Sequence, residues 1–89
     1  MNENDFFYIL GFLKASRLRL TTLKAIGTGV MMPSEISGKA NIRTSQASSA
    51  LRDLKGKGLV VCINDDVRKG RLYRCTSLGL EVLEYIEFN

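Results

Sequence analysis

The segment from Ser34 to Thr76 is the most informative part of the chain: SEISGKANIRTSQASSALRDLKGKGLVVCINDDVRKGRLYRCT. Its apolar residues recur first at helical spacing and then in the alternation of strands. In order, these patterns predict a short helix over 35–40, a turn over 41–43, a helix over 44–56 and a hairpin whose charged loop spans 65–71. This layout is expected to put one polar helix and one basic loop on the same face.

The helix over 44–56 has an apolar stripe and a polar side. The stripe, at i, i+3, i+4 and i+7, consists of Ala47, Ala50, Leu51 and Leu54. The opposite side carries Ser45, Ser49, Arg52, Asp53 and Gly56, with Gln46 and Ser48 on its flanks. Thr44 or Ser45 is the expected N-cap, because a hydroxyl accepts a hydrogen bond from the free amides of the first turn. A small, polar exposed face suits DNA.

The segment before that helix is expected to be a short helix with a strand ahead of it. Pro33 biases the preceding residue away from helix, and Ser34 is the expected N-cap. Gly38 weakens the helix, and Ile42 is expected to be a buried plug that fixes the angle between the two helices. The apolar residues 30–32 are expected to form a small first strand beside the hairpin.

Alternation along the hairpin predicts its core face and its register. The residues expected to face the core are Leu59, Val61, Ile63, Tyr73 and Cys75. This choice pairs Val61 with Cys75 and Ile63 with Tyr73, and it places Cys62 opposite Arg74 on the outer face. The two cysteines then point to opposite sides, which disfavours a disulfide. Cys75 is interpreted as a small core residue and Cys62 as a free thiol, with no support for redox sensing.

The N-terminal part is predicted to be helical. Asn4 or Asp5 is the expected cap of a helix whose apolar positions are Phe6, Phe7, Ile9, Leu10 and Leu13. A second helical pattern follows, and we favour a break near Ala15 over one long helix. Ser16 is then the cap of the second piece, and the paired glycines that begin at Gly27 end it.

The last helix, capped by Thr76 and Ser77, has more apolar residues than one narrow stripe requires. The surplus is taken to be Leu80, Leu83 and Phe88, beside an acidic stripe of Glu81, Glu84 and Glu87. A twofold dimer interface built with the phenylalanine-rich N-terminal helix is the favoured explanation. The alternative is that the N-terminal helix of the same chain covers the surplus.

Charge is distributed unevenly along the chain. The net charge is +4, but 39–74 contains nine lysines and arginines against three aspartates, a balance of +6, and the rest has four basic against six acidic residues, a balance of −2. A basic middle predicts contact with a polyanion. A solvated charged surface is the alternative interpretation.

Several classes of function are disfavoured by the residues present. With no histidine and only two cysteines, no metal site is expected. No nucleophile–base pair or phosphate-binding glycine motif is present, so neither an enzyme nor a cofactor is predicted. No run approaches the roughly 18 consecutive apolar residues of a membrane span, and the acidic start over 2–5 is unlike a signal peptide. The expectation is a cytoplasmic protein without membrane contact.

Three segments resemble winged helix-turn-helix regulators of the ArsR and MarR type. Residues 16–20 resemble the opening helix of the ArsR group, 45–60 resemble a recognition helix that runs into a Gly-Leu-Val strand, and 70–79 resemble the return of the wing and the start of the last helix. The metal motif of the ArsR group is absent, and the chain is shorter than MarR proteins. Metal sensing and a ligand pocket are therefore not carried over.

The resemblance implies a homodimer whose two recognition helices enter successive major grooves. The residues it places on DNA are Thr44, Ser45, Gln46, Ser48, Ser49 and Arg52, with Arg68, Lys69 and Arg71 in the wing. Lys39, Arg43, Lys55 and Lys57 are expected to add nonspecific attraction that weakens with salt. From the hydrogen-bonding groups of the two side chains, Gln46 is expected to read adenine and Arg52 to read guanine or hold the backbone.

Together these observations predict an α+β, mostly helical fold in one domain over 1–89. The fold is a winged helix-turn-helix with a three-helix core, a β-hairpin wing and flanking N- and C-terminal helices. The predicted function is sequence-specific binding of double-stranded DNA by a homodimeric transcriptional repressor, with 44–56 in the major groove and 65–71 on the backbone or minor groove. The alternative is a protein-interaction module of a transcription or replication complex, and no small-molecule effector is indicated.

Overall fold

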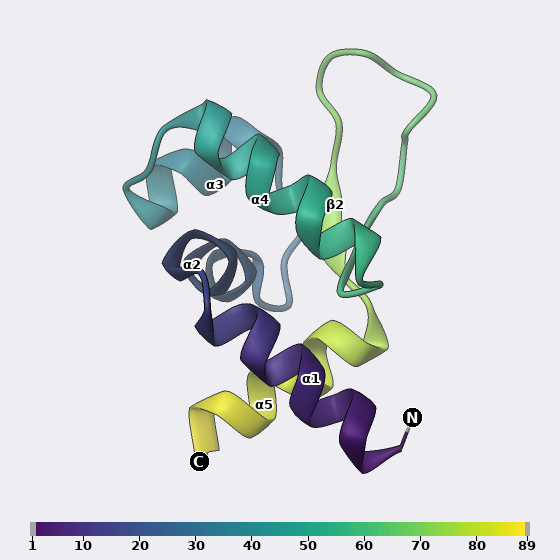
Figure 1. Ribbon diagram of the computed structural model, residues 1–89. Coiled ribbons are helices and arrows are strands. Elements are labelled where there is room, and N and C mark those ends of the chain that lie inside the picture. Colours follow the sequence, from purple (N-terminus) through teal and green to yellow (C-terminus); the bar gives the residue numbers. More distant parts are fainter. Residues whose placement is uncertain (1, 89) are drawn as a thin grey trace.

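The computed structural model describes residues 2–88, which form five helices and one two-stranded antiparallel hairpin (Figure 1). In chain order they are α1 (Glu3–Lys14), α2 (Arg17–Ile26), α3 (Pro33–Ala40), α4 (Thr44–Gly56), β1 (Val60–Cys62), β2 (Tyr73–Cys75) and α5 (Ser77–Phe88). The mostly helical α+β prediction is therefore confirmed, as are the hairpin and its long charged loop. None of the helices in the described part of the chain has the length and apolar character needed to cross a membrane.

The break between α1 and α2 lies where it was predicted. Ser16 is the N-cap of α2, and its Oγ accepts a hydrogen bond from the backbone N–H of Arg19 at 3.3 Å. Gly27, with a φ of 52°, ends α2. The start of α1 was predicted wrongly, because Asn2 is the cap instead of Asn4 or Asp5. Its Oδ1 accepts from the N–H of Asp5 at 2.9 Å, which satisfies an amide of the first turn.

The helices α3 and α4 begin without the hydroxyl caps that were predicted. The N-caps are Met32 and Arg43, whose side chains make no capping hydrogen bond. Their backbone N–H groups instead donate to Glu35 Oε1 at 2.8 Å and to Gln46 Oε1 at 2.9 Å. The side chain at the third helical position thus reaches back to the cap, which is the half of a capping box that needs no hydroxyl.

A three-helix core is formed by α2, α3 and α4. Its buried side chains include Leu23, Ile36, Leu51 and Leu54, all at most 1% exposed. Between α3 and α4 the chain turns at Asn41, which has a φ of 56°, and Ser37 Oγ donates to the carbonyl of Ile42 at 2.6 Å. Ile42 itself is only half-buried and packs at the edge of the core, so it is not the buried plug that was expected.

The hairpin register differs by one residue from the predicted one. Val60 pairs with Cys75, Val61 with Arg74 and Cys62 with Tyr73. Because side chains alternate between faces, a slip of one residue exchanges the two faces of β1. Val60 and Cys62 are therefore buried, while Ile63, predicted to face the core, is 49% exposed.

The error in register arises at Leu59, which belongs to the end of α4 rather than to the strand. Gly58 has a φ of 72° and donates to Lys55, and Leu59 donates to the carbonyl of Leu54 at 3.0 Å. This is the Schellman pattern, in which the residue after the left-handed glycine packs back on the helix. Leu59 is fully buried for that reason, and the alternation of the strand begins only at Val60.

Both cysteines consequently lie on the buried side of the hairpin, and the predicted outward position of Cys62 is wrong. Cys62 and Cys75 are 7% and 6% exposed, and both are free thiols. The absence of a bond between them agrees with the prediction, although the predicted reason, opposite faces, does not hold. Burial raises the pKa of Cys75 to about 11. Its side chain therefore stays a protonated, unreactive thiol at neutral pH.

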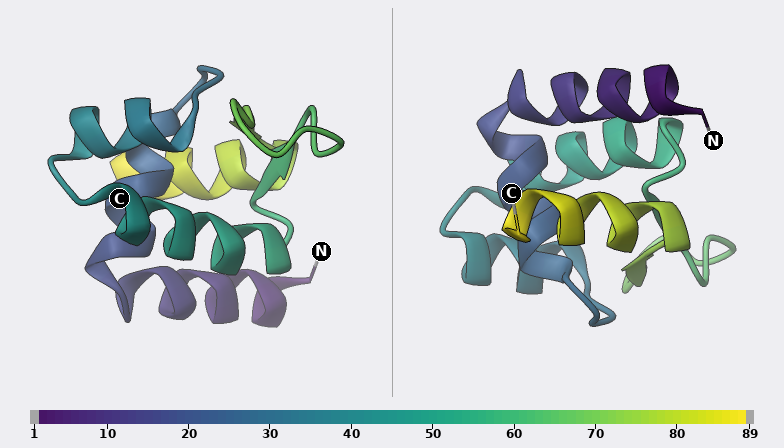
Figure 2. Two further views of the ribbon diagram at one scale, coloured as in Figure 1. Left: turned by 90° about the horizontal axis from the view of Figure 1, so that it is seen from above. Right: turned by 90° about the horizontal axis from the view of Figure 1, so that it is seen from below.

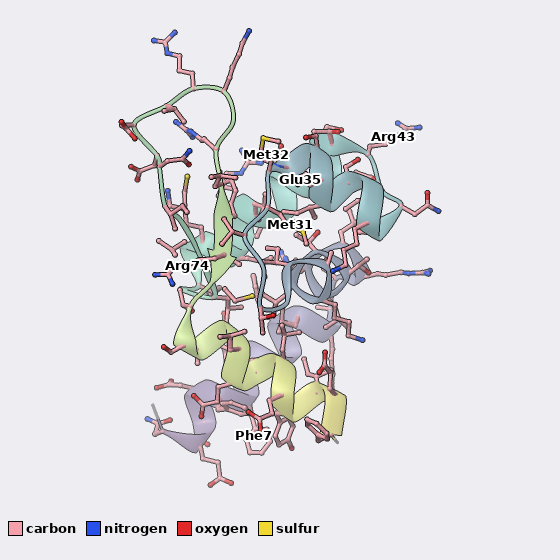
Figure 3. The ribbon with its side chains drawn as sticks, turned by 180° about the vertical axis from the view of Figure 1, so that it is seen from behind. Phe7, Met31, Met32, Glu35, Arg43 and Arg74 are labelled. Carbon is pink, nitrogen blue, oxygen red and sulfur yellow. The ribbon has the colours of Figure 1, made fainter. Side chains whose placement is uncertain are left out.

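The strand predicted ahead of α3 is present as an isolated bridge. Met31 and Tyr73 exchange two backbone hydrogen bonds of 3.0 and 2.8 Å. The segment that leads into α3 is thereby attached to the far edge of β2, and the helix-turn-helix is joined to the hairpin. Figure 3 shows Met31 and Met32 between the hairpin and α3.

The last helix closes the side of the molecule opposite the hairpin loop. Thr76 Oγ1 accepts from the N–H of Gly79 at 3.1 Å, as predicted for a cap, and donates to the carbonyl of Gly58 at 2.6 Å. The view from below in Figure 2 shows α5 lying across this side with α1 alongside it.

Part of the predicted apolar surplus of α5 stays exposed. Leu83 is buried within the chain, which contradicts its assignment to the surplus, whereas Leu80 and Phe88 are 38% and 78% exposed. The ring of Phe6 in α1 packs edge-on against Tyr85, with 5.2 Å between centroids. The N-terminal helix of the same chain therefore covers some of the surface but leaves the rest open.

Candidate nucleic-acid interface

A groove of about 430 Å³ lies between α4 and the loop that joins β1 to β2, hereafter the wing, residues 63–72. Its lining residues are Pro33, Ser48, Leu51, Arg52, Lys55, Arg68, Gly70, Arg71 and Tyr73. Arg52 and Lys55 come from the helix wall, and Arg68 and Arg71 come from the wing wall. Four cations thus face one groove from two elements that are distant in sequence, and none of the described residues that line it is acidic.

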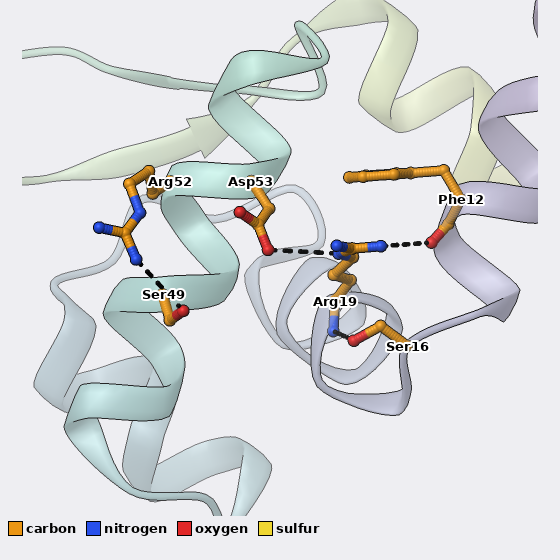
Figure 4. Close-up of polar contacts among 6 residues, drawn as sticks. All are labelled: Phe12, Ser16, Arg19, Ser49, Arg52 and Asp53. Atoms are coloured by element: carbon orange, nitrogen blue, oxygen red, sulfur yellow. Dashed lines mark hydrogen bonds and ion pairs between the residues drawn. The ribbon is translucent and has the colours of Figure 1, made fainter.

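The helix wall is positioned by the buried stripe of α4. Ala47 and Leu54 are fully buried in the core that α4 shares with α2 and α3, so the polar positions on the other side of the helix point away from the core. Arg52 is exposed and makes one hydrogen bond, from Nη2 to Ser49 Oγ at 3.5 Å (Figure 4). A bond of that length leaves the guanidinium free to turn toward a ligand.

Asp53 lies on a different side of α4 from the one predicted. Its Oδ2 forms an ion pair of 3.3 Å with Arg19 Nε, and Arg19 Nη1 donates to the carbonyl of Phe12 at 3.2 Å (Figure 4). The guanidinium also lies 4.1 Å from the centre of the Phe12 ring. The only carboxylate of α4 is therefore engaged with α1 and α2, away from the cations of the groove.

The first turn of α4 is exposed at Thr44 and Ser45. Gln46 is half-buried, and its Oε1 already accepts from the N–H of Arg43. The amide NH₂ of Gln46 is left for a ligand, and Oε1 keeps a second lone pair. The bidentate contact to adenine expected of Gln46 uses both amide atoms, so a ligand either shares Oε1 with the capping bond or replaces that bond.

The structure separates the predicted cations into groups. Lys39 and Arg43 are exposed at the end of the α3–α4 pair that lies away from the wing, where Figure 3 shows Arg43. Lys57 is directed to α1, with Nζ at 5.0 and 5.4 Å from the ring centres of Tyr8 and Phe12. Of the predicted site residues, the groove brings together Ser48, Arg52, Lys55, Arg68 and Arg71, while Ser49 and Lys69 are exposed outside its lining.

Sequence reasoning did not identify Asn64 and Tyr73 as parts of the site. Tyr73 was assigned to the core; it is half-buried, packs against the core on the same face of β2 as Cys75, and also lines the groove. Asn64 joins the two sides of the wing by hydrogen bonds to Gly70 and Leu72. The tendency of asparagine to bond nearby backbone in turns was the available signal.

No group suited to a metal is present in the part of the chain that the structure describes, where three or more cysteine, aspartate or glutamate side chains never gather. The groove offers only cations, one serine and one tyrosine as polar side chains. Its chemistry therefore suits an anion of extended shape, such as a row of phosphates.

Comparison with known proteins gives a relationship of fold only. No family model and no curated protein matches the sequence. A similar solved structure is that of TubR bound to 24 base pairs of tubC from Bacillus thuringiensis serovar israelensis pBtoxis. It superposes with a TM-score of 0.80 at 12% identity, over 99% of this chain and 95% of that one. The likeness shows the winged helix-turn-helix fold and does not single out the ArsR or MarR type.

Proposed function

We propose that this protein is a sequence-specific DNA-binding transcriptional regulator, a repressor that acts as a homodimer. The observation that carries the proposal is the groove between α4 and the wing, where four cations face each other without an acid among its lining residues. The structurally similar TubR is bound to base pairs of tubC, which supports a nucleic-acid ligand for the same fold.

In this proposal α4 enters the major groove and the wing follows the adjacent backbone or minor groove. The exposed side of α4 offers Ser45, Ser49 and Arg52 to base edges. Arg68 and Lys55 neutralise phosphates of the strand that passes between helix and wing. Lys39 in the last turn of α3 and Arg43 at the N-cap of α4 add contacts to a neighbouring backbone segment.

The proposed dimer uses the exposed apolar surface of α1 and α5, hereafter the back face, which consists of Phe7, Leu80, Tyr85 and Phe88. Phe7 is 51% and Phe88 is 78% exposed, which is more aromatic surface than a small monomer ordinarily leaves in water. The back face lies away from the wing (Figure 1). A second copy docked there leaves both α4–wing grooves free, and the bound dimer represses by occluding the promoter.

The test is fluorescence anisotropy of labelled random-sequence duplexes, titrated with the protein at several salt concentrations, followed by selection of the bound fraction. The proposal expects affinity that falls steeply with salt, as counterion release requires, and enrichment of a palindromic site. Absence of binding at low salt would overturn the proposal. That outcome favours the alternative of a protein-interaction module, to which the exposed back face also lends itself.

A further inference from the structure

The wing is a ten-residue loop with little backbone support of its own. Within it, the backbone hydrogen bonds join Ile63 to Leu72 at 2.9 Å and Val67 to Asn64 at 3.2 Å. Ordering such a loop costs roughly 1–2 kcal/mol for each residue that is fixed. A defined wing conformation therefore requires further interactions, and two side chains provide them.

Asn64 holds the base of the wing. Its Oδ1 accepts from the N–H of Leu72 at 2.7 Å, and its Nδ2 donates to the carbonyl of Gly70 at 3.1 Å. Cys62 Sγ also donates to Oδ1, at 3.6 Å. The side chain of Asn64 thus connects the first part of the wing to its returning part at two residues, Gly70 and Leu72.

Arg71 holds the tip of the wing. Its Nε donates to the carbonyl of Val67 at 2.7 Å, and its Nη2 donates to the carbonyl of Asp65 at 3.3 Å. The guanidinium therefore spans the loop and satisfies carbonyls of the opposite side. Gly70, with a φ of 74°, provides the reversal that brings Arg71 back across the loop.

These contacts divide the basic residues of the wing into two kinds. Arg68 and Lys69 are exposed, and no hydrogen bond to the loop involves their side chains in the described structure. Arg71 uses two of its donors inside the loop. The planar, forked guanidinium can bind two carbonyls at once, whereas a lysine ammonium cannot reproduce that geometry.

We propose that Asn64 and Arg71 form a clamp that orders the wing in the free protein and thereby positions Arg68 against the DNA backbone. This inference rests on the proposed function for its DNA part. Arg71 then acts as a positioning residue rather than as a phosphate contact. Its charge lies on the wall of the groove, but its guanidinium donates its hydrogen bonds to carbonyls of the wing.

The clamp is tested first without DNA, by amide hydrogen exchange of the full chain. Asn64→Ala removes the acceptor of the Leu72 amide, and we expect about tenfold faster exchange there, the typical value of one hydrogen bond. Asn64→Asp retains the acceptor and loses the donor to Gly70, so we expect a smaller effect. Asp66→Ala is the control on the same loop, with exchange unchanged. Amides of α2 serve as the folding reference, and an unchanged Leu72 rate in Asn64→Ala would overturn the clamp.

The DNA part is tested by replacing arginine with lysine at two positions of the wing. The clamp predicts that Arg71→Lys weakens binding almost as much as Arg71→Ala, about tenfold, although the charge is kept. Arg68→Lys should retain most of the affinity, because a phosphate accepts either cation. Binding of Arg71→Lys equal to that of the native protein would overturn the positioning role.

The two failures are distinguishable. If the native protein binds no DNA at low salt, the proposed function and the DNA role of the clamp are both overturned. The exchange experiment still decides whether Asn64 orders the wing, because it needs no ligand.

Discussion

The α4–wing face and the back face are built from opposite kinds of side chain. The first presents Arg52, Lys55 and Arg68 around a groove, and its only nearby acid in α4 is turned away to Arg19. The second presents aromatic and aliphatic side chains beside the three glutamates of α5. A small domain can thus carry a cationic groove on its helix-turn-helix and wing and an apolar surface on the helices α1 and α5.

The largest effect is expected from the contact that joins the two faces. At Gly79, at the start of α5, a Cβ would collide with the carbonyl of Leu59. We expect Gly79→Ala to lower the free energy of unfolding by about 3 kcal/mol, because backbone must move to relieve the overlap. Urea denaturation measures it.

The control for this prediction is Gly11→Ala in α1, where a Cβ meets no atom within 4 Å. Alanine is favoured over glycine inside a helix, so this change should stabilise by roughly 0.5–1 kcal/mol. Equal effects of the two substitutions would show that the start of α5 is not tightly packed on Leu59 at the end of α4.

The next effect tests the α4–wing face. Arg52→Ala removes the exposed guanidinium of the helix wall. We expect binding to the selected DNA to become less favourable by roughly 1–3 kcal/mol. Lys14→Ala removes an exposed cation from α1, far along the chain from the groove, and should leave affinity nearly unchanged. Anisotropy titrations compare them, and equal losses would mean that charge alone, without the groove, governs binding.

A somewhat smaller effect tests the back face. Phe7→Glu places a charge on the proposed dimer surface. We expect association of the two copies to become less favourable by about 1.5 kcal/mol. Ile63→Glu is the matched control, since the two side chains are 51% and 49% exposed but lie on different faces. Sedimentation equilibrium gives both values. A monomeric native protein, or dissociation caused by Ile63→Glu alone, would argue against this dimer surface.

The smallest effect concerns the ion pair that keeps Asp53 away from the groove. The side chains of Arg19 and Asp53 are 27% and 40% exposed, so solvent screens their attraction. We expect Asp53→Asn to cost about 0.5 kcal/mol of stability, and less at high salt. Thermal unfolding at two salt concentrations measures it, and a loss that does not change with salt would show that packing rather than charge holds Arg19.

Local patterns account for most of the fold that was predicted correctly. Helical spacing located every helix, and Ser16 and Thr76 identified the starts of α2 and α5 because a cap is a contact between neighbours in sequence. The caps of α3 and α4 were missed, since Glu35 and Gln46 replace the expected hydroxyls. Helix starts of that kind depend on which of two local hydrogen bonds forms.

Most of the errors came from contacts that periodicity does not report. Alternation alone could not say that Leu59 ends α4 instead of starting β1, and this one residue exchanged the faces of Val61 and Cys62. The position of Lys57 over the rings of α1 could not be predicted either. A helical wheel gives the direction of a side chain around its own helix but not which other element packs on that side.

The order of helices and strands, the excess of cations between 39 and 74 and the polar side of α4 could all be predicted from the amino-acid sequence. They depend on periodicity and composition, which are properties of short segments. Three arrangements required the packed molecule: Arg52 and Lys55 face Arg68 across one groove, Asp53 pairs with Arg19, and Arg71 bonds to carbonyls across the wing. Those arrangements depend on how the packed core orients each element, which no single segment encodes.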